Sequence, residues 1–222
     1  MRILNKNNVY VLGTGRCGTT SLAEKLGGLH EPEPNIIHES TQFYLGKQDI
    51  QARLIDKLIE RKKLKATAIV DHKQSMVIPL LRYIDPAAEF ILLVREPLAC
   101  IESLYARGAY SKEEQKKRKA IWVKNRLRPY TDFPKDWTAF MKCTWYWLET
   151  HRVIFSTIGN AKFSILLTDE IGTDVTQNKS EASYKDRLRK KQNKGLTKQE
   201  ESLLDNYALP MWEQIQAYST RK

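Results

Sequence analysis

The chain has 222 residues, of which 41% are hydrophobic and 28% charged, and its formal net charge is +11. This length can bury one sizeable core, and the composition is not that of a disordered chain. The sequence has no apolar run of about 18 residues and no signal-peptide pattern, so we expect no transmembrane segment. Three scattered cysteines without CxxC spacing argue against a disulfide framework or a zinc site. We therefore expect a cytoplasmic protein with a single domain spanning residues 1–222.

The positive charge is concentrated in two segments, residues 111–128 and 179–198. Each contains eight basic and two acidic residues, and the rest of the chain sums to −1. Such segments are either solvated helix faces or binding surfaces for a local anionic partner. The stretch 171–195 is polar and poor in apolar residues, which predicts a mobile basic segment or one that becomes ordered on binding.

Short apolar runs alternate with longer amphipathic segments along the chain. In chain order we expect a strand at 9–12, helices at 19–26 and 49–64, a strand at 66–70, a helix at 76–83, a strand at 89–94, helices at 97–109 and 137–158, a strand at 162–167, and a helix at 197–218 kinked at Pro210. This alternation predicts an α/β fold in which helices flank both faces of a parallel sheet. Because ligands of such sheets bind beyond the carboxyl ends of the strands, the turns after Leu12, Val70 and Val94 are the expected site.

The first of these turns is rich in glycine and reads GTGRCGTTSL. Gly13, Gly15 and Gly18 allow successive backbone N–H groups to converge on one anion, and the helix that follows adds its positive N-terminal end. Compared with the GxxxxGK[ST] pattern, Thr19 takes the place of the lysine, and no strand-ending acidic partner for magnesium stands out. The turn therefore predicts a phosphate site but argues against an ATP or GTP hydrolase.

The same turn resembles the 5′-phosphosulfate loop of sulfotransferases, in which a basic residue lies two places before the last glycine and Gly-Thr-Thr follows. The resemblance implies a P-loop NTPase-like sulfotransferase architecture and the sulfuryl donor 3′-phosphoadenosine 5′-phosphosulfate (PAPS), without a metal. Arg16 would then stabilise the charge that develops on the bridging oxygen. By the same resemblance, the 5′-phosphate end of the donor is bound by Gly15, Arg16, Cys17, Gly18, Thr19 and Thr20.

A second motif, LLVREPLACIESLY, follows the apolar run at 89–94. It contains Arg95 at the strand end and Ser103 eight residues later, inside the expected helix. A guanidinium and a hydroxyl so placed can converge on one dianionic phosphate. The spacing resembles the 3′-phosphate motif of sulfotransferases. Taken alone, Arg95 could instead form an ion pair with Glu96, and Ser103 could be a buried helix hydroxyl.

Sulfuryl transfer needs a base that accepts the proton of the acceptor. The segment LHEPEPN supplies Glu31 as the first candidate and Glu33 as the second, since several sulfotransferase branches have a catalytic glutamate a little downstream of the phosphate loop. His72, in the turn after Val70, is the rival, because the cytosolic branch uses a histidine after a comparable strand. Lys73 beside it could hold the sulfate or an acidic acceptor, and Glu33 could contact the acceptor. The alternative is that both acids are solvated loop residues and that Lys73 is an ordinary surface lysine.

The resemblance is looser in the C-terminal half, where Lys190, Lys191 and Lys194 are candidates for the 3′-phosphate and the aromatic residues near 137–147 are expected in a helix core. The sequence predicts a sulfotransferase that uses PAPS and an acceptor of unidentified class, whether saccharide, lipid, small alcohol or peptide. Two alternatives stay open. One is a nucleic-acid-binding protein that uses the basic segments, and the other is a nucleotide or nucleoside kinase.

Overall fold

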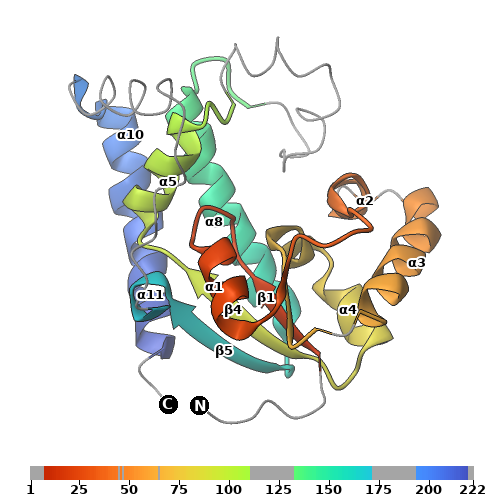
Figure 1. Ribbon diagram of the computed structural model, residues 1–222. Helices are drawn as coiled ribbons and strands as arrows, with labels where there is room; N and C mark the ends of the chain where they lie inside the picture. Colours follow the sequence, from red (N-terminus) through yellow and green to blue (C-terminus); the bar gives the residue numbers. More distant parts are fainter. Residues whose placement is uncertain are drawn as a thin grey trace. The chain divides into compact units, whose positions relative to one another are not determined.

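The computed structural model describes residues 8–44, 46, 48–64, 66–110, 133–171 and 194–219 (Figure 1). The chain divides into two compact units. The first comprises Met1–Val94 and Thr150–Thr173, and the second comprises Arg95–Glu149 and Asp174–Lys222. Each unit is described by itself below. Most of both basic segments lies outside the described residues.

A five-stranded parallel sheet forms the centre of the first unit. Its strands are β1 Val9–Leu12, β2 Leu29–His30, β3 Ala68–Val70, β4 Glu89–Val94 and β5 Lys162–Leu167, in the spatial order β2-β3-β1-β4-β5. In the register, Val11 lies opposite Val70 on one side and Ile91 on the other. Every residue of β1 and β3 is buried, as expected for parallel strands covered on both faces. The predicted α/β class with a parallel sheet is confirmed.

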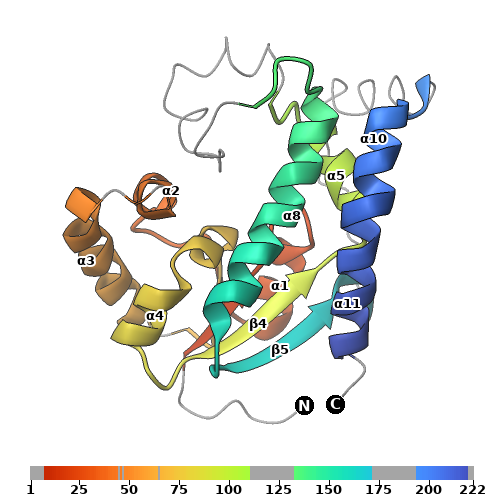
Figure 2. The same cartoon turned by 180° about the vertical axis from the view of Figure 1, so that it is seen from behind.

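Helices cover both faces of this sheet. The helical elements of the first unit are α1 Thr19–Leu26, α2 Ile37–Tyr44, η1 Gln48–Ile50, α3 Gln51–Lys62, η2 His72–Met76, α4 Ile78–Ile84, η3 Thr168–Ile171 and the end of α8 Ala139–Ile158. The helix α1 lies in front of the sheet in Figure 1, and the end of α8 lies in front of it in the reverse view of Figure 2. Leu22 and Ala23 of α1 pack on Val9, Val11 and Val70.

Helix α1 ends where two consecutive glycines follow it. Gly27 has a φ of 60°, a left-handed conformation that glycine adopts without strain, and the Gly28 N–H donates to Ala23 O at 2.8 Å. The chain then turns directly into β2. Gly28 also packs closely, because a Cβ at this position would lie 2.6 Å from Ala68 O.

The described part of the second unit is helical. It contains α5 Pro97–Ala106, the beginning of α8, α10 Lys198–Leu203, the π-helical turn η4 Leu204–Ala208 and α11 Leu209–Ser219. Phe140 and Trp147 are fully buried on α8, as expected for a core helix. The expected kinked C-terminal helix is divided instead: the wider π turn precedes Pro210, which has no N–H for a helical bond. None of the helices in the described ranges has both the length and the apolar character needed to cross a membrane.

Most of the predicted elements agree with the structure. The strands at 9–12, 89–94 and 162–167 and the helix at 19–26 have the expected bounds, whereas the strand at 66–70 is limited to Ala68–Val70. The expected helix at 76–83 begins only at Ile78, because the preceding residues form the tight turn η2. The sequence did not predict β2 or α2.

Candidate functional site

The candidate site lies at the carboxyl edge of the sheet in the first unit. There, β1, β2 and β3 end at Leu12, His30 and Val70, which the parallel register brings to the same edge. Three segments leave from this edge: the glycine loop 13–18, the segment 31–35 and the turn η2. Because ligands of open α/β sheets bind at such edges, the three segments define the site.

The glycine loop has an unusual backbone. Gly15, Arg16 and Gly18 have φ values of 72°, 62° and 91°, and a positive φ is uncommon for a residue such as Arg16. Tight turns in which left-handed residues adjoin right-handed ones can form concave arrays of N–H groups that bind anions. Gly18 precedes α1 without any capping side chain, so the helix offers its first N–H groups and its positive end. These features make the loop a candidate anion site.

Two glycines of the loop allow close packing. A Cβ on Gly13 would lie 2.8 Å from Leu93 O and 3.0 Å from Cys17 Sγ. A Cβ on Gly15 would lie 3.4 Å from the imidazole ring of His72. The imidazole of His72 therefore lies beside the glycine loop, at van der Waals distance from the space that a side chain at position 15 would occupy.

Ser75 fixes the loop to η2. Its hydroxyl accepts a hydrogen bond from Gly13 N and donates one to Gly13 O, each at 2.9 Å. Ser75 is fully buried. Since His72 begins the same short turn, this pair of bonds sets the position of the imidazole relative to the loop.

Glu31, His72 and Lys73, which the sequence named as separate candidates, form one cluster. The His72 Nδ1 lies 3.0 Å from Glu31 Oε1, and Lys73 Nζ donates to Glu31 Oε2 at 3.0 Å. Lys73 is buried, His72 is half-buried, and Glu31 has a left-handed φ of 45°. The hydrogen bond from His72, followed by the positive charges of His72 and Lys73, holds the pKa of Glu31 far below its usual range. Glu31 is thus a carboxylate at any physiological pH.

Beneath this cluster lies a buried ion pair that the sequence reading missed. Asp71 directly follows β3 and is fully buried, and its carboxylate accepts from Arg61 Nη1 at 2.7 Å. Asp71 is an acidic residue that directly follows a strand, and its place right after the apolar run ending at Val70 could have identified it from the sequence. Arg61 continues the stripe of Leu54 and Leu58 on the buried face of α3, which is an unusual place for a cation.

Three of these side chains could also serve as metal ligands. Donor atoms of Glu31, Asp71 and His72 lie within 4.8 Å of one another. Glu31 is already paired with Lys73, and Asp71 with Arg61. Two protein cations would therefore compete with any metal ion for these carboxylates.

The other predicted residues of the first unit lie around the loop. Cys17 is buried in the core cluster, and its carbonyl lies 2.7 Å from the hydroxyl of Thr168. The hydroxyl of Thr19 lies 3.1 Å from His30 Nε2, whereas Thr20 is exposed. Glu33 is also exposed, and its carboxylate accepts from Asn35 N, which makes it part of a local turn rather than of the Glu31 cluster.

Arg95 and Ser103 belong to the second unit. Arg95 is the residue directly after β4 and is half-buried, and Ser103 is buried in α5. The carboxylate of Glu96 accepts from Leu98 N and Ala99 N and so caps α5. The roles of Arg95 and Ser103 toward a 3′-phosphate stay predictions. Lys194 is exposed, and Lys190 and Lys191 lie outside the described residues.

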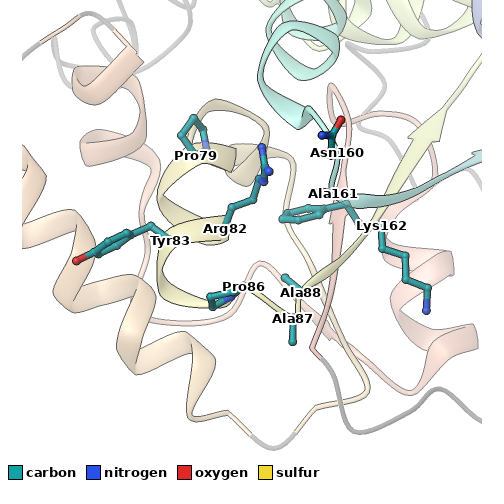
Figure 3. A pocket seen from close by; sticks show the side chains of 10 residues that line it. Pro79, Arg82, Tyr83, Pro86, Ala87, Ala88, Asn160, Ala161 and Lys162 are labelled. Carbon is teal, nitrogen blue, oxygen red and sulfur yellow. The ribbon is translucent and has the colours of Figure 1, made fainter.

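A pocket of about 550 Å³ lies elsewhere in the first unit, where β4 and β5 begin (Figure 3). It is lined by α4 and by the turn before β5, with Arg82, Tyr83, Pro86 and Asn160 among its side chains. None of the predicted site residues lines it. Since β4 and β5 begin here, the pocket lies at the amino edge of the sheet rather than at the loop edge.

Comparison with known proteins gives no assignment. No protein-family model matches the chain, and a search of curated proteins finds no match either. The geometry of the residues themselves must therefore carry the functional argument.

Proposed function

We propose that this protein is a PAPS-dependent sulfotransferase that transfers a sulfuryl group to a hydroxyl or amine. One observation carries the proposal: the glycine loop, with its left-handed Gly15 and Arg16, lies beside the imidazole of His72, which is hydrogen-bonded to Glu31. An anion site thus adjoins an oriented acid–base group. Transfer of a charged group to a protic acceptor needs this combination.

The geometry supports His72 as the base and Glu31 as the residue that orients it. A carboxylate whose pKa is held far below its usual range is a weak proton acceptor, which argues against Glu31 as the base. By accepting from Nδ1–H, Glu31 instead fixes the tautomer in which Nε2 of His72 carries the free electron pair. Lys73 neutralises the charge of Glu31.

The loop residues fit the phosphosulfate end of the donor. N–H groups of residues 15–18 and of the first turn of α1 would bind the 5′-phosphate, and Arg16 would stabilise the leaving phosphate. PAPS supplies an activated sulfuryl group. His72 accepts the proton of the acceptor as the new bond to sulfur forms and the bond from sulfur to the bridging oxygen breaks. The products are a sulfated acceptor and 3′,5′-adenosine bisphosphate.

The first test is calorimetric titration with 3′,5′-adenosine bisphosphate, with 5′-AMP and ATP–Mg²⁺ in parallel. We expect the bisphosphate to bind most tightly and Arg95→Ala to weaken it. Arg107→Ala, an exposed arginine that follows the same helix, is the matched control. Equal affinity of wild type and Arg95→Ala for the bisphosphate would refute the role of Arg95.

The second test measures transfer of radiolabelled sulfate from PAPS to a panel of saccharides, lipids, phenols and peptides. His72→Gln should leave bisphosphate binding intact and abolish turnover, and Glu31→Gln should lower turnover by a factor of about 100 to 10,000. If Glu31→Gln is inactive while His72→Gln keeps most of its activity, Glu31 is the base instead.

A nucleotide kinase is the second candidate, because Asp71 follows the strand next to β1. An acid at this position can hold the magnesium ion of a bound nucleotide, although Asp71 is buried and paired with Arg61. Tighter binding of ATP–Mg²⁺ than of the bisphosphate would favour the kinase. If only generic oligonucleotides bind, with a steep salt dependence, the nucleic-acid alternative is favoured.

A further inference from the structure

Arg61, near the end of α3, makes three well-formed hydrogen bonds to two parts of the candidate site. Its Nε donates to Pro34 O at 2.8 Å, its Nη2 to Pro32 O at 2.6 Å, and its Nη1 to Asp71 Oδ2 at 2.7 Å. Only 1% of the residue is exposed. A buried guanidinium with all three nitrogens engaged is a rigid junction, because its donors have a fixed planar geometry.

The segments joined by Arg61 carry the members of the acid–base cluster. Pro32 and Pro34 directly follow Glu31, which has a left-handed backbone that surrounding contacts must hold in place. Asp71 directly precedes His72, and its Oδ1 accepts from Lys73 N at 3.0 Å. Arg61 thus links the carbonyls of Pro32 and Pro34 to the carboxylate of Asp71.

The charge of Arg61 also determines which carboxylate Lys73 pairs with. Lys73 Nζ lies 3.0 Å from Glu31 Oε2 and 3.8 Å from Asp71 Oδ1, so the two carboxylates compete for one ammonium group. Asp71 is the more deeply buried, and an unpaired charge there would be costly. Because Arg61 neutralises Asp71, Lys73 can pair with Glu31.

We infer that Arg61 is a positioning residue of the proposed sulfotransferase: it aligns Glu31 with His72 by holding the segment 31–34 and Asp71 together. This inference rests on the proposed function. The three hydrogen bonds of Arg61 go to Pro32, Pro34 and Asp71 rather than to the glycine loop, so it acts through Glu31 and Lys73.

The test compares Arg61→Lys with Lys57→Ala. Lysine keeps the charge beside Asp71 but cannot reach three acceptors in a plane. Lys57 is the matched control, because it lies one turn earlier on α3 and contacts the same segment at Asn35 O, but not Asp71. We expect kcat to fall about 100-fold in Arg61→Lys, with bisphosphate affinity and the KM for PAPS nearly unchanged, and no comparable fall in Lys57→Ala.

A second measurement does not depend on turnover. Nitrogen-15 NMR of the imidazoles reports the tautomer of His72, whose signals are assigned through the His72→Gln variant. In the wild type, Nδ1 should carry the proton, and in Arg61→Lys the signals should indicate a mixture of tautomers. Arg61→Ala should show the same change, and added guanidinium should restore both the wild-type tautomer and kcat.

The outcomes separate the inference from the proposed function. If the wild type transfers no sulfate but Arg61→Lys still changes the tautomer, the proposed function fails and the positioning role stands. If the tautomer and kcat of Arg61→Lys equal those of the wild type, the positioning role is refuted. The positioning role would also be refuted if the fall in kcat of Arg61→Lys were fully accounted for by a smaller fraction of folded protein while the tautomer of His72 stayed unchanged.

Discussion

Ser75 joins the end of β1 to the turn that carries His72, and its removal should destabilise the first unit measurably. In Ser75→Ala, both bonds to Gly13 are lost, and the buried N–H of Gly13 is left without its acceptor. An unmade buried hydrogen bond costs about 1–3 kcal/mol. We therefore expect the unfolding free energy to fall by roughly 2 kcal/mol, which lowers the Tm of a chain of this size by roughly 4–8 °C.

Thermal unfolding followed by circular dichroism measures this change. Ser156→Ala is the matched control, because Ser156 is exposed and its hydroxyl donates to Val153 O within the same helix. That variant should lie within about 0.5 kcal/mol of the wild type. Bisphosphate affinity should fall in Ser75→Ala alone, since the start of the glycine loop is no longer fixed. Equal Tm values for the two variants would refute the anchoring role of Ser75.

Three further predictions concern pH and backbone strain. The pKa of Glu31 is lowered in the folded state, so the stability that this carboxylate contributes is present above its ordinary pKa of 4.5 and is lost as the pH falls below that value. The Tm difference between wild type and Glu31→Gln should therefore shrink on acidification. Burial, assisted by Asp85, raises the pKa of Tyr10 above its ordinary value of 10.0, so the stability of the protein should fall as the pH rises past that value. When Tm is measured as a function of pH, Tyr10→Phe should show a smaller decrease in Tm above pH 10 than the wild type. Gly15→Ala and Gly27→Ala both place a side chain at a left-handed φ and should each cost roughly 1–2 kcal/mol in urea unfolding. Only Gly15→Ala should also lower turnover, because the strained position 15 adjoins the imidazole, which would lie 3.4 Å from the new Cβ; equal turnover in the two variants would contradict this.

Sequence patterns predict elements well where burial alone determines them. The run VYVL is apolar enough to be buried along its whole length, and EFILLV is buried along most of it; this burial sets their bounds. The strand β2 is different: Leu29 and His30 are exposed, and the strand exists because Leu29 pairs with Ile69 and His30 with Val70. Pairing with a distant strand leaves no local pattern, so this element could not be predicted.

The sequence analysis named Glu31, His72 and Lys73 as candidates, but it did not predict the hydrogen bonds and ion pairs that join them. Glu31 and His72 were read as rivals for one role because spacing along the chain cannot show that their side chains meet. Their contact depends on the left-handed backbone of Glu31 and on the hydrogen bonds that Arg61 donates to the carbonyls of Pro32 and Pro34. Each of these features is set by tertiary contacts between α3 and the sheet edge.

Under the proposed function, the charges at this edge give a reason why the glycine loop needs no lysine. Arg61, Asp71, Lys73 and Glu31 alternate in sign and sum to zero, so Lys73 serves the carboxylate of Glu31 rather than a bound phosphate. The attraction for an anion then has to come from the N–H groups of the loop, the N-terminus of α1 and Arg16. In the proposed reaction, these four charges balance one another, so His72 can accept the proton of the acceptor while the loop and Arg16 hold the leaving phosphate. This division of charge adds electrostatic support to the sulfotransferase proposal, which rests on the position of His72 beside the glycine loop.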